Sequence, residues 1–171
     1  MAYEKFGREG RPEGKIKVIK ILDALNRHGA RYIVIGGWAV ILHGFTRMTM
    51  DLDIMVEPSR ENLTRILDAL REFSKDKSLE ELPQIDLTQY GVVRVMPEDF
   101  GVVIDLVWKI GNIDYQKAVQ DAEEAEIDGV KIKIAGLDTL IKMKNTVRPK
   151  DQMDLLFLKG KKEFLEKQGE L

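Results

Sequence analysis

Asp51-Leu52-Asp53-Ile54-Met55-Val56 decides the fold of this chain, together with the pair Gly36-Gly37 that precedes it. The apolar residues between and after the two aspartates predict a strand over residues 51–56. Alternate residues of a strand point to the same side, so Asp51 and Asp53 project together from one face. Two parallel carboxylates repel each other and are costly to desolvate unless a cation lies between them. Their oxygen atoms suit Mg²⁺, which commonly accompanies nucleotide phosphates, so the pair predicts a cation site.

The glycine pair lies between a predicted apolar strand, residues 32–35, and a predicted short helix, residues 38–43. Glycine lets backbone N–H groups approach a phosphate closely, and a helix N-terminus favours negative charge. Taken alone, Gly36-Gly37 is usually a tight turn. The chain has neither the phosphate loop that ends in Gly-Lys-Ser/Thr nor a Gly-x-Gly-x-x-Gly fingerprint. The pair gains its meaning from the nearby aspartates and is a candidate phosphate site.

A third carboxylate, Asp105, lies in the middle of an otherwise apolar strand predicted over residues 102–108. A buried aspartate requires a partner, because an unpaired buried charge costs several kcal/mol. One interpretation is a structural aspartate held by an arginine or by backbone amides. The other, favoured by Asp51 and Asp53 on a strand nearby, is a cluster of three carboxylates. Such a cluster can hold two cations about 3.5–4 Å apart.

In this order, Gly36-Gly37, Asp51-x-Asp53 and Asp105 resemble the nucleotidyltransferase superfamily with the DNA polymerase β-like palm. The closer resemblance is to minimal nucleotidyltransferases of bacteria and archaea and to the nucleotidyltransferase toxins of type IV abortive-infection systems. It covers residues 30–158. It also rests on the lead-in Arg47-x-Thr49-x-Asp51 and on two C-terminal segments: Leu137-Asp138-Thr139-Leu140-Ile141-x-Met143-Lys144 and Arg148-Pro149-Lys150-Asp151-x-x-Asp154-Leu155.

The resemblance implies an α/β (α+β) palm, with a mixed sheet, helices packed mainly on one side and the active site at an open edge. It implies transfer of a nucleotidyl group from an NTP such as ATP to an acceptor hydroxyl, with release of pyrophosphate and two Mg²⁺ or Mn²⁺ ions. Gly36 and Gly37 would hold the triphosphate. Asp51 and Asp53 would bind both metal ions, and Asp105 would ligate the catalytic one and help to deprotonate the acceptor.

Further nucleotide-binding candidates flank these motifs. Lys144 continues the apolar face of a helix predicted over residues 137–147, so its side chain either reaches the rim or points into a pocket. Arg47 and Thr49 precede the aspartate pair, where they either contact a phosphate or only shape the loop. Arg148, Lys150 and Asp151 are weaker candidates, because an aspartate at the start of the last predicted helix commonly caps it.

The acceptor and the partners stay open. The candidate acceptors are RNA, protein or a small molecule, including the acceptors of aminoglycoside-type enzymes, which would require an acidic pocket. A protein from a different functional class would be a palm that binds a nucleotide or a partner without turnover, such as a toxin–antitoxin component. A cognate antitoxin-like partner or a homodimer would then complete it.

Charge distribution bears on the acceptor. Residues 142–162 hold seven Lys or Arg against two acidic residues, while residues 121–128 hold five acidic ones. Both segments read most simply as solvated faces, and the basic one alternatively faces an anionic substrate such as RNA or the NTP. The net charge of −2 provides no general field that attracts nucleic acid.

Length and composition indicate an ordinary globular protein of 171 residues, 44% of them hydrophobic and 33% charged. We expect a loose N-terminus over residues 1–14 and one domain over residues 15–171. No cysteine occurs, which excludes thiolate chemistry, and no apolar run approaches the roughly 18–20 residues of a membrane span. The polar N-terminus lacks the apolar core of a signal peptide, so we expect a cytoplasmic protein without a membrane partner.

The rest of the chain predicts alternating elements. Apolar spacing predicts helices around residues 18–25, 59–73 and 115–122. Residues 92–96 and 102–108 read as two strands joined by turn residues, and residues 131–134 as a further strand after an Asp-Gly turn. Residues 74–89 read as an irregular loop with a poorly defined strand near Ile85.

Overall fold

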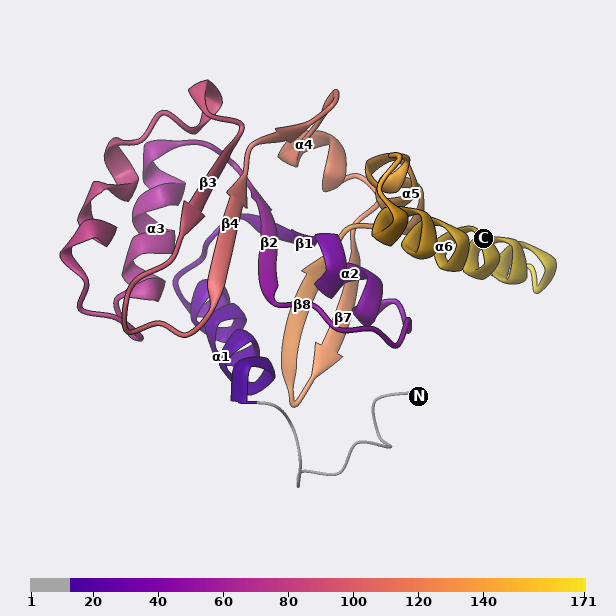
Figure 1. Cartoon of the computed structure of the whole chain (residues 1–171), viewed down its shortest axis with the longest axis horizontal. Coiled ribbons are helices and arrows are strands. Elements are labelled where there is room, and N and C mark those ends of the chain that lie inside the picture. The colour runs from indigo at the N-terminus through magenta and orange to yellow at the C-terminus, as the bar shows by residue number, and fades with distance from the viewer. Residues whose placement is uncertain (1–12) are drawn as a thin grey trace.

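A mixed six-stranded sheet forms the centre of the molecule in the computed structural model, which describes residues 13–171 (Figure 1). The strands lie in the order β3-β4-β2-β1-β8-β7. Their bounds are Tyr32–Ile35 for β1, Asp51–Val56 for β2, Val92–Val95 for β3, Val103–Val107 for β4, Glu123–Ile127 for β7 and Val130–Ile134 for β8. A small separate ribbon pairs β5 (Lys109–Ile110) with β6 (Ile113–Asp114).

Both parallel and antiparallel pairs occur in the main sheet. Strand β2 runs antiparallel to β1 and parallel to β4. Strand β8 runs parallel to β1, and the hairpins β3–β4 and β7–β8 are antiparallel. The expected mixed sheet of an α+β palm is therefore confirmed.

The helices fall into two groups. Their bounds are Glu13–Arg27 for α1, Gly36–Leu42 for α2, Arg60–Leu70 for α3, Tyr115–Ala118 for α4, Leu137–Lys144 for α5 and Pro149–Lys167 for α6. Helices α1 and α3 pack against each other beside the strands, while α2, α5 and α6 gather at the other end of the molecule (Figure 1).

Alternation along β2 and β4 separates the core from the candidate site. Leu52 and Ile54 on β2 and Leu106 on β4 are completely buried, as is Val56. Because side chains alternate along a strand, Asp51, Asp53 and Asp105 lie on the opposite face. The predicted strand over residues 51–56 has these bounds in the structure.

Several expected elements differ from the structure. Residues 74–89 contain two 3₁₀-helices, η1 (Lys77–Gln84) and η2 (Leu87–Gln89), so the prediction of a strand near Ile85 was wrong. The side chains of Asp76 and Asp86 each accept a hydrogen bond from a backbone N–H two residues on and so start these helices. The helix expected over residues 115–122 is the single turn α4.

The C-terminal helices also have different ends from those expected. Helix α5 stops at Lys144 rather than near residue 147, because Asn145 leaves the helical conformation. Helix α6 begins at Pro149, whose missing N–H costs nothing in a first helical turn. Asp151 is therefore not the cap of this helix but lies inside its first turn, where it is 1% exposed.

Two expectations concern other parts of the chain. Of the N-terminal stretch expected to be loose, residues 1–12 lie outside the described residues, and residues 13 and 14 belong to α1. Within residues 13–171, no helix is both long enough and apolar enough to cross a bilayer.

Candidate active site

Strand register brings the three aspartates together. Strands β2 and β4 pair in parallel with Asp53 opposite Asp105, and Asp51 lies two residues before Asp53 on the same face. The sequence places these residues 52 positions apart, and the sheet makes Asp53 and Asp105 direct neighbours. On the other side of β2, Ile35 pairs with Asp53, so the chain enters Gly36 beside the same carboxylate.

Gly36 lies against the carboxylate of Asp53. Its φ of +64° belongs to the left-handed region that favours glycine. A Cβ atom at this position would lie 2.2 Å from Oδ2 of Asp53, far inside van der Waals contact. Residues 36 and 37 form the first turn of α2, so the glycine pair starts the helix rather than preceding it.

We expect Gly36→Ala to lower nucleotidyl transfer about 100-fold, because the added methyl group must displace Asp53, and misplacing a catalytic group by about 1 Å has such an effect. The left-handed backbone should also cost about 1–2 kcal/mol of stability. Gly129→Ala is the matched control, since Gly129 has φ +80° but no atom within 4 Å of an added Cβ. Steady-state rates and urea unfolding of both variants separate the two effects. Equal loss of rate in both would contradict the contact.

The environment of Asp53 opposes its ionisation. Burial, followed by the negative charge of neighbouring Asp105, raises the pKa of Asp53 to about 6 in the metal-free protein. The charge of Asp51 acts in the same direction, whereas Lys144 partly offsets it. A carboxyl group held in this way gains a large free energy when a cation reaches it.

Arg94 of β3 is a site residue that the sequence analysis missed. Its Nε and Nη2 atoms donate to Oδ1 and Oδ2 of Asp105, each at 2.9 Å, and Nη2 also lies 3.3 Å from Oδ2 of Asp51. These bonds hold the pKa of Asp105 below its usual range. Two signals were present in the sequence: Asp105 could be held by an arginine, and Arg94 lies in the predicted strand that turn residues join to the strand of Asp105.

The carboxylates have the chemistry of a metal site but not yet its geometry. Three aspartates on one face are the donor set that Mg²⁺ or Mn²⁺ prefers, and burial together with the charge of Asp105 raises the pKa of Asp53. Within residues 13–171, however, no three carboxylates or imidazoles converge as a metal ion requires. Both oxygens of Asp105 accept from Arg94 instead, so the residues fit the ions once that pair opens.

Basic side chains lie on the other side of the carboxylates. Lys144 of α5 is 8% exposed, and its Nζ lies 2.9 Å from Asp154 and 3.3 Å from Asp151, both on α6. Arg148 also pairs with Asp151. Burial opposes ionisation of Asp151, but the hydrogen bonds from Arg148 and Thr146 outweigh it and lower its pKa to about 2. Lys144 therefore points into the pocket rather than toward the rim.

Arg47, in the loop before β2, pairs with Asp154, which also pairs with Lys144. Its Nη1 donates to Oδ2 of Asp154 at 2.7 Å, and the two side chains are 10% and 1% exposed. Nη2 of Arg47 is buried and has no hydrogen-bond partner among the described residues. A Cβ at Gly37 would lie 2.8 Å from the Thr49 hydroxyl and 3.0 Å from Nη1 of Arg47. The absence of a side chain at Gly37 thus lets both groups approach the first turn of α2.

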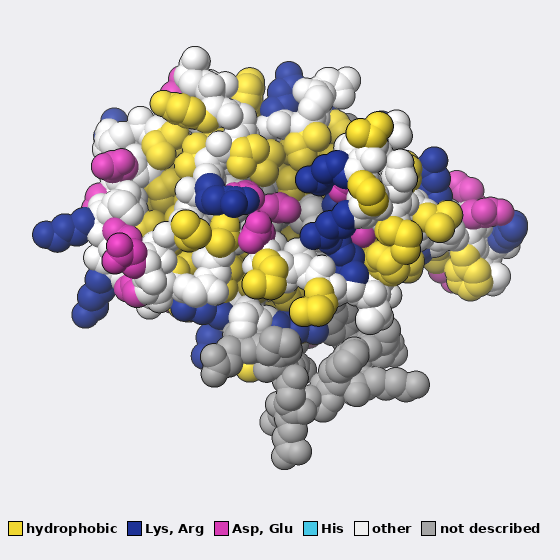
Figure 2. Space-filling model, in the orientation of Figure 1, with side chains coloured by type: hydrophobic (Ala, Val, Ile, Leu, Met, Phe, Trp, Pro, Cys, Tyr) yellow, Lys and Arg dark blue, Asp and Glu magenta, His cyan; other side chains and the backbone are white. Residues whose placement is uncertain are grey.

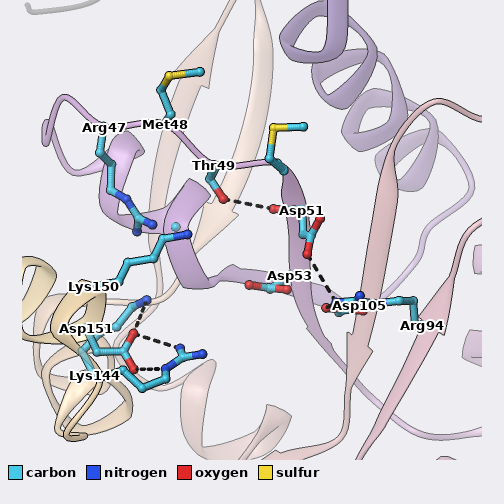
Figure 3. A pocket seen from close by; sticks show the side chains of 13 residues that line it. Arg47, Met48, Thr49, Asp51, Asp53, Arg94, Asp105, Lys144, Lys150 and Asp151 are labelled. Carbon is cyan, nitrogen blue, oxygen red and sulfur yellow. Dashed lines mark hydrogen bonds and ion pairs between the residues drawn. The ribbon is translucent and has the colours of Figure 1, made fainter.

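These groups line one cavity of about 650 Å³. Figure 3 shows the carboxylates of β2 and β4 between Arg94 on one side and Lys144 and Lys150 on the other. In Figure 2 the acidic side chains form a small central group on this face, flanked by basic ones. All the predicted site residues except Gly36 line the cavity. The residues that line it are Gly37, Arg47, Met48, Thr49, Met50, Asp51, Asp53, Arg94, Asp105, Lys144, Arg148, Lys150 and Asp151.

The acidic segment of residues 121–128 lies elsewhere. Most of it forms β7, the edge strand that β1 and β8 separate from β2. Its exposed glutamates are therefore no part of the cavity. His43 caps the C-terminal end of α2, and its Nε2 donates to the carbonyl of Ala135 at 2.8 Å.

A mixed sheet that presents three carboxylates beside a glycine turn and a basic group defines a nucleotidyltransferase palm. The sequence model of the aminoglycoside-2''-adenylyltransferase family matches residues 17–154. The chain belongs to this family. No curated protein sequence matches it significantly.

Solved structures show the same fold. A Thermotoga maritima protein assigned as a nucleotidyltransferase superposes with a TM-score of 0.55 at 14% identity, over 97% of this chain and 100% of its own. ANT(2'')-Ia, in complex with adenylyl-2''-tobramycin, superposes with a TM-score of 0.52 at 15% identity, over 82% and 84% of the two chains. At these identities the likeness concerns the fold alone.

Proposed function

We propose that this protein is a metal-dependent nucleotidyltransferase that moves an NMP from an NTP, such as ATP, to an acceptor hydroxyl and releases pyrophosphate. The observation that carries the proposal is that acidic and basic side chains lie next to each other in one cavity. Three carboxylates from adjacent strands lie next to a glycine turn and to the nearly buried cations Arg47 and Lys144. Phosphoryl-type transfer is mostly positioning and charge neutralisation, and it requires these parts.

The acidic and the basic residues of the cavity would have different roles. Asp51, Asp53 and Asp105 would hold two Mg²⁺ or Mn²⁺ ions, which supply charge stabilisation and an activated hydroxyl when bound. The backbone of Gly36 and Gly37, with Arg47, Thr49 and Lys144, would hold the triphosphate. The unpaired Nη2 of Arg47 supports this assignment, because a buried donor without a partner is costly and an anion satisfies it.

In the reaction, the acceptor oxygen forms a bond to the α-phosphorus while the bond from this phosphorus to the bridging α–β oxygen breaks. Pyrophosphate carries away the electron pair of that bond, and the proton of the acceptor hydroxyl passes to solvent water. Lys144 and Arg47 would neutralise the charge on the leaving group. Asp105 is a poor proton acceptor while Arg94 donates to both of its oxygens.

The charges of the cavity bear on the acceptor. Its basic members outnumber its acidic ones, and Asp151 is already paired with Arg148 and Lys144. If the other three aspartates hold metal ions, no free carboxylate in the cavity stays available for a polycation. This composition favours a neutral or anionic acceptor, such as RNA, over a cationic aminoglycoside.

Aminoglycoside adenylylation is the second candidate, because the family carries that name. A type IV toxin role and an antitoxin-like partner stay predictions from the resemblance. An assay with α-labelled NTPs separates these acceptors. We expect label on RNA or protein and none on tobramycin or its relatives, and efficient aminoglycoside labelling would overturn the charge argument.

Nucleotide binding is tested first, by thermal denaturation with each of the four NTPs and Mg²⁺ or Mn²⁺. A ligand at a hundredfold excess over its dissociation constant adds about 2.7 kcal/mol to the free energy of unfolding. We expect metal-dependent stabilisation by at least one NTP in the wild type and none in Asp51→Asn/Asp53→Asn. Stabilisation without any label transfer would instead support a palm that binds nucleotide without turnover, and no stabilisation by any NTP would contradict the site.

A further inference from the structure

Arg94 makes the closest ionic contact to the carboxylates. It lies on β3, directly opposite Asp105 in the antiparallel register. Its guanidinium binds Asp105 through two parallel hydrogen bonds of 2.9 Å and extends to Asp51 at 3.3 Å. One cationic group therefore bridges two of the three carboxylates, one from β2 and one from β4.

This contact neutralises charge that would otherwise be uncompensated. Asp51, Asp53 and Asp105 face one another across two adjacent strands, and like charges at such a site repel strongly. The planar fork of arginine matches a carboxylate in both shape and charge. Arg94 thus performs in the metal-free protein the task that a divalent cation would perform in the loaded one.

Guanidinium and metal exclude each other at Asp105. Mg²⁺ requires carboxylate oxygens at about 2.0–2.1 Å in near-octahedral geometry. Both oxygens of Asp105 are directed at Arg94, and in this arrangement no three ligands converge among residues 13–171. A metal ion that uses Asp105 must first displace the arginine from at least one of them.

Displacement requires no change in the core. The side chain of Arg94 is 57% exposed, and β3 is the edge strand of the sheet. Its neighbours on the strand face, Val92 and Met96, are 49% and 66% exposed. The long side chain can therefore turn into solvent, or over the outer edge of the site, while the backbone of β3 stays paired.

We propose that Arg94 is a positioning residue that stands in for a metal cation and sets the metal concentration at which the site fills. In the metal-free state it holds Asp105 and Asp51 in place. Metal and nucleotide displace it, and Asp105 becomes free to ligate. This inference rests on the proposed function, because it concerns how the same carboxylates become available.

The test measures binding of Mn²⁺ alone to the full-length, metal-free protein by the loss of its free-ion EPR signal. We expect Arg94→Gln to bind Mn²⁺ about 10-fold to 100-fold more tightly than the wild type, the range expected for loss of a charged hydrogen-bond pair. Arg94→Lys keeps the charge but loses the fork, so its affinity should lie between the two. Arg71→Gln is the control, because Arg71 is a half-exposed arginine of the α3 region paired with Asp68 outside the cavity.

A second measurement observes the arginine itself. The Nε–H resonance of Arg94, identified by its loss in Arg94→Lys, should be protected from solvent exchange in the metal-free protein. Addition of Mg²⁺ with a non-hydrolysable NTP analogue should remove this protection.

The outcomes separate the two proposals. Equal or weaker Mn²⁺ binding by Arg94→Gln, while the wild type and Arg71→Gln bind normally, would overturn the role of Arg94 and leave the proposed function intact. Protection of Nε–H that persists in the loaded protein would do the same. Absence of Mn²⁺ binding in every variant, with and without ATP, would overturn both.

Discussion

Asp53→Asn is expected to abolish nucleotidyl transfer and, in the same protein, to raise the stability of the metal-free chain at neutral pH. The loss of transfer follows from the proposed shared metal ligand. A metal ion contributes several kcal/mol of transition-state stabilisation, which corresponds to a factor of about 1,000 or more. The gain in stability follows from the burial of the Asp53 carboxylate and from the charge of nearby Asp105, since asparagine has the shape of aspartate without its charge.

The pKa of Asp53 gives the sign and the pH range of the stability effect. Its value rises from 3.8 to about 6 on folding, so the folded state binds the proton more tightly than the unfolded state. Below about pH 4 both states are protonated and the wild type bears no penalty. Between pH 4 and pH 6 the penalty grows, and above pH 7 it is complete at no more than ~3 kcal/mol.

Urea unfolding in EDTA at pH 4 and pH 8 measures this difference. We expect Asp53→Asn and the wild type to be similar at pH 4 and the variant to be more stable at pH 8. Asp68→Asn is the control, because Asp68 is a half-exposed aspartate of α3 outside the cavity. Full transfer activity in Asp53→Asn would exclude Asp53 as a shared ligand, and lower stability at pH 8 would show that its charge is better compensated than the contacts indicate.

Asp154→Ala is expected to cost about 3–5 kcal/mol of stability, the range measured when one partner of a buried ion pair is removed. Oδ2 of Asp154 binds both Arg47, at 2.7 Å, and Lys144, at 2.9 Å. These cations are 10% and 11% exposed, so the substitution leaves two nearly buried positive charges with less compensation. In a domain of this size the melting temperature should fall by about 10 °C or more.

Thermal and urea unfolding of Asp154→Ala give the magnitude, and Glu163→Ala provides the control on the same helix. Glu163 pairs with Lys167 at the surface, where both side chains are about two-thirds exposed, so its loss should change stability by less than about 0.5 kcal/mol. An NTP with Mg²⁺ should restore more stability to Asp154→Ala than it adds to the wild type, because the triphosphate would replace the missing negative charge. A loss as small as that of Glu163→Ala would contradict the buried network.

The sequence predicted that Asp51 and Asp53 share one face of a strand, because local pattern determines this placement. Two aspartates at alternate positions share a face of any strand, and an aspartate within an apolar strand requires a partner nearby. The sequence pattern did not show how the residues of β2 align with those of β4. The direct pairing of Asp53 with Asp105 depends on β2 and β4 being adjacent and parallel, which only the sheet order provides.

The ionic partners were harder to predict. Arg94 lay in a predicted strand without any assigned role, and its contact with Asp105 follows from the antiparallel register of β3. Asp151 was expected to cap α6, the usual role of an aspartate there, but Pro149 starts the helix earlier and turns Asp151 inward. Asp154 belonged to the C-terminal pattern without any assigned role. Each of these partners depends on packing between elements distant in the sequence.

The pairing of Arg47 with Asp154 across 107 residues has a consequence for synthesis of the chain. Translation adds about 5–20 residues per second, so Arg47 leaves the ribosome about 5–20 seconds before Asp154 does. During this interval the carboxylate strands can already pair, while the basic side has no counter-charge and must stay hydrated. A nascent chain that ends before α6 therefore carries the three aspartates without the ion-pair network that fixes Arg47 and Lys144.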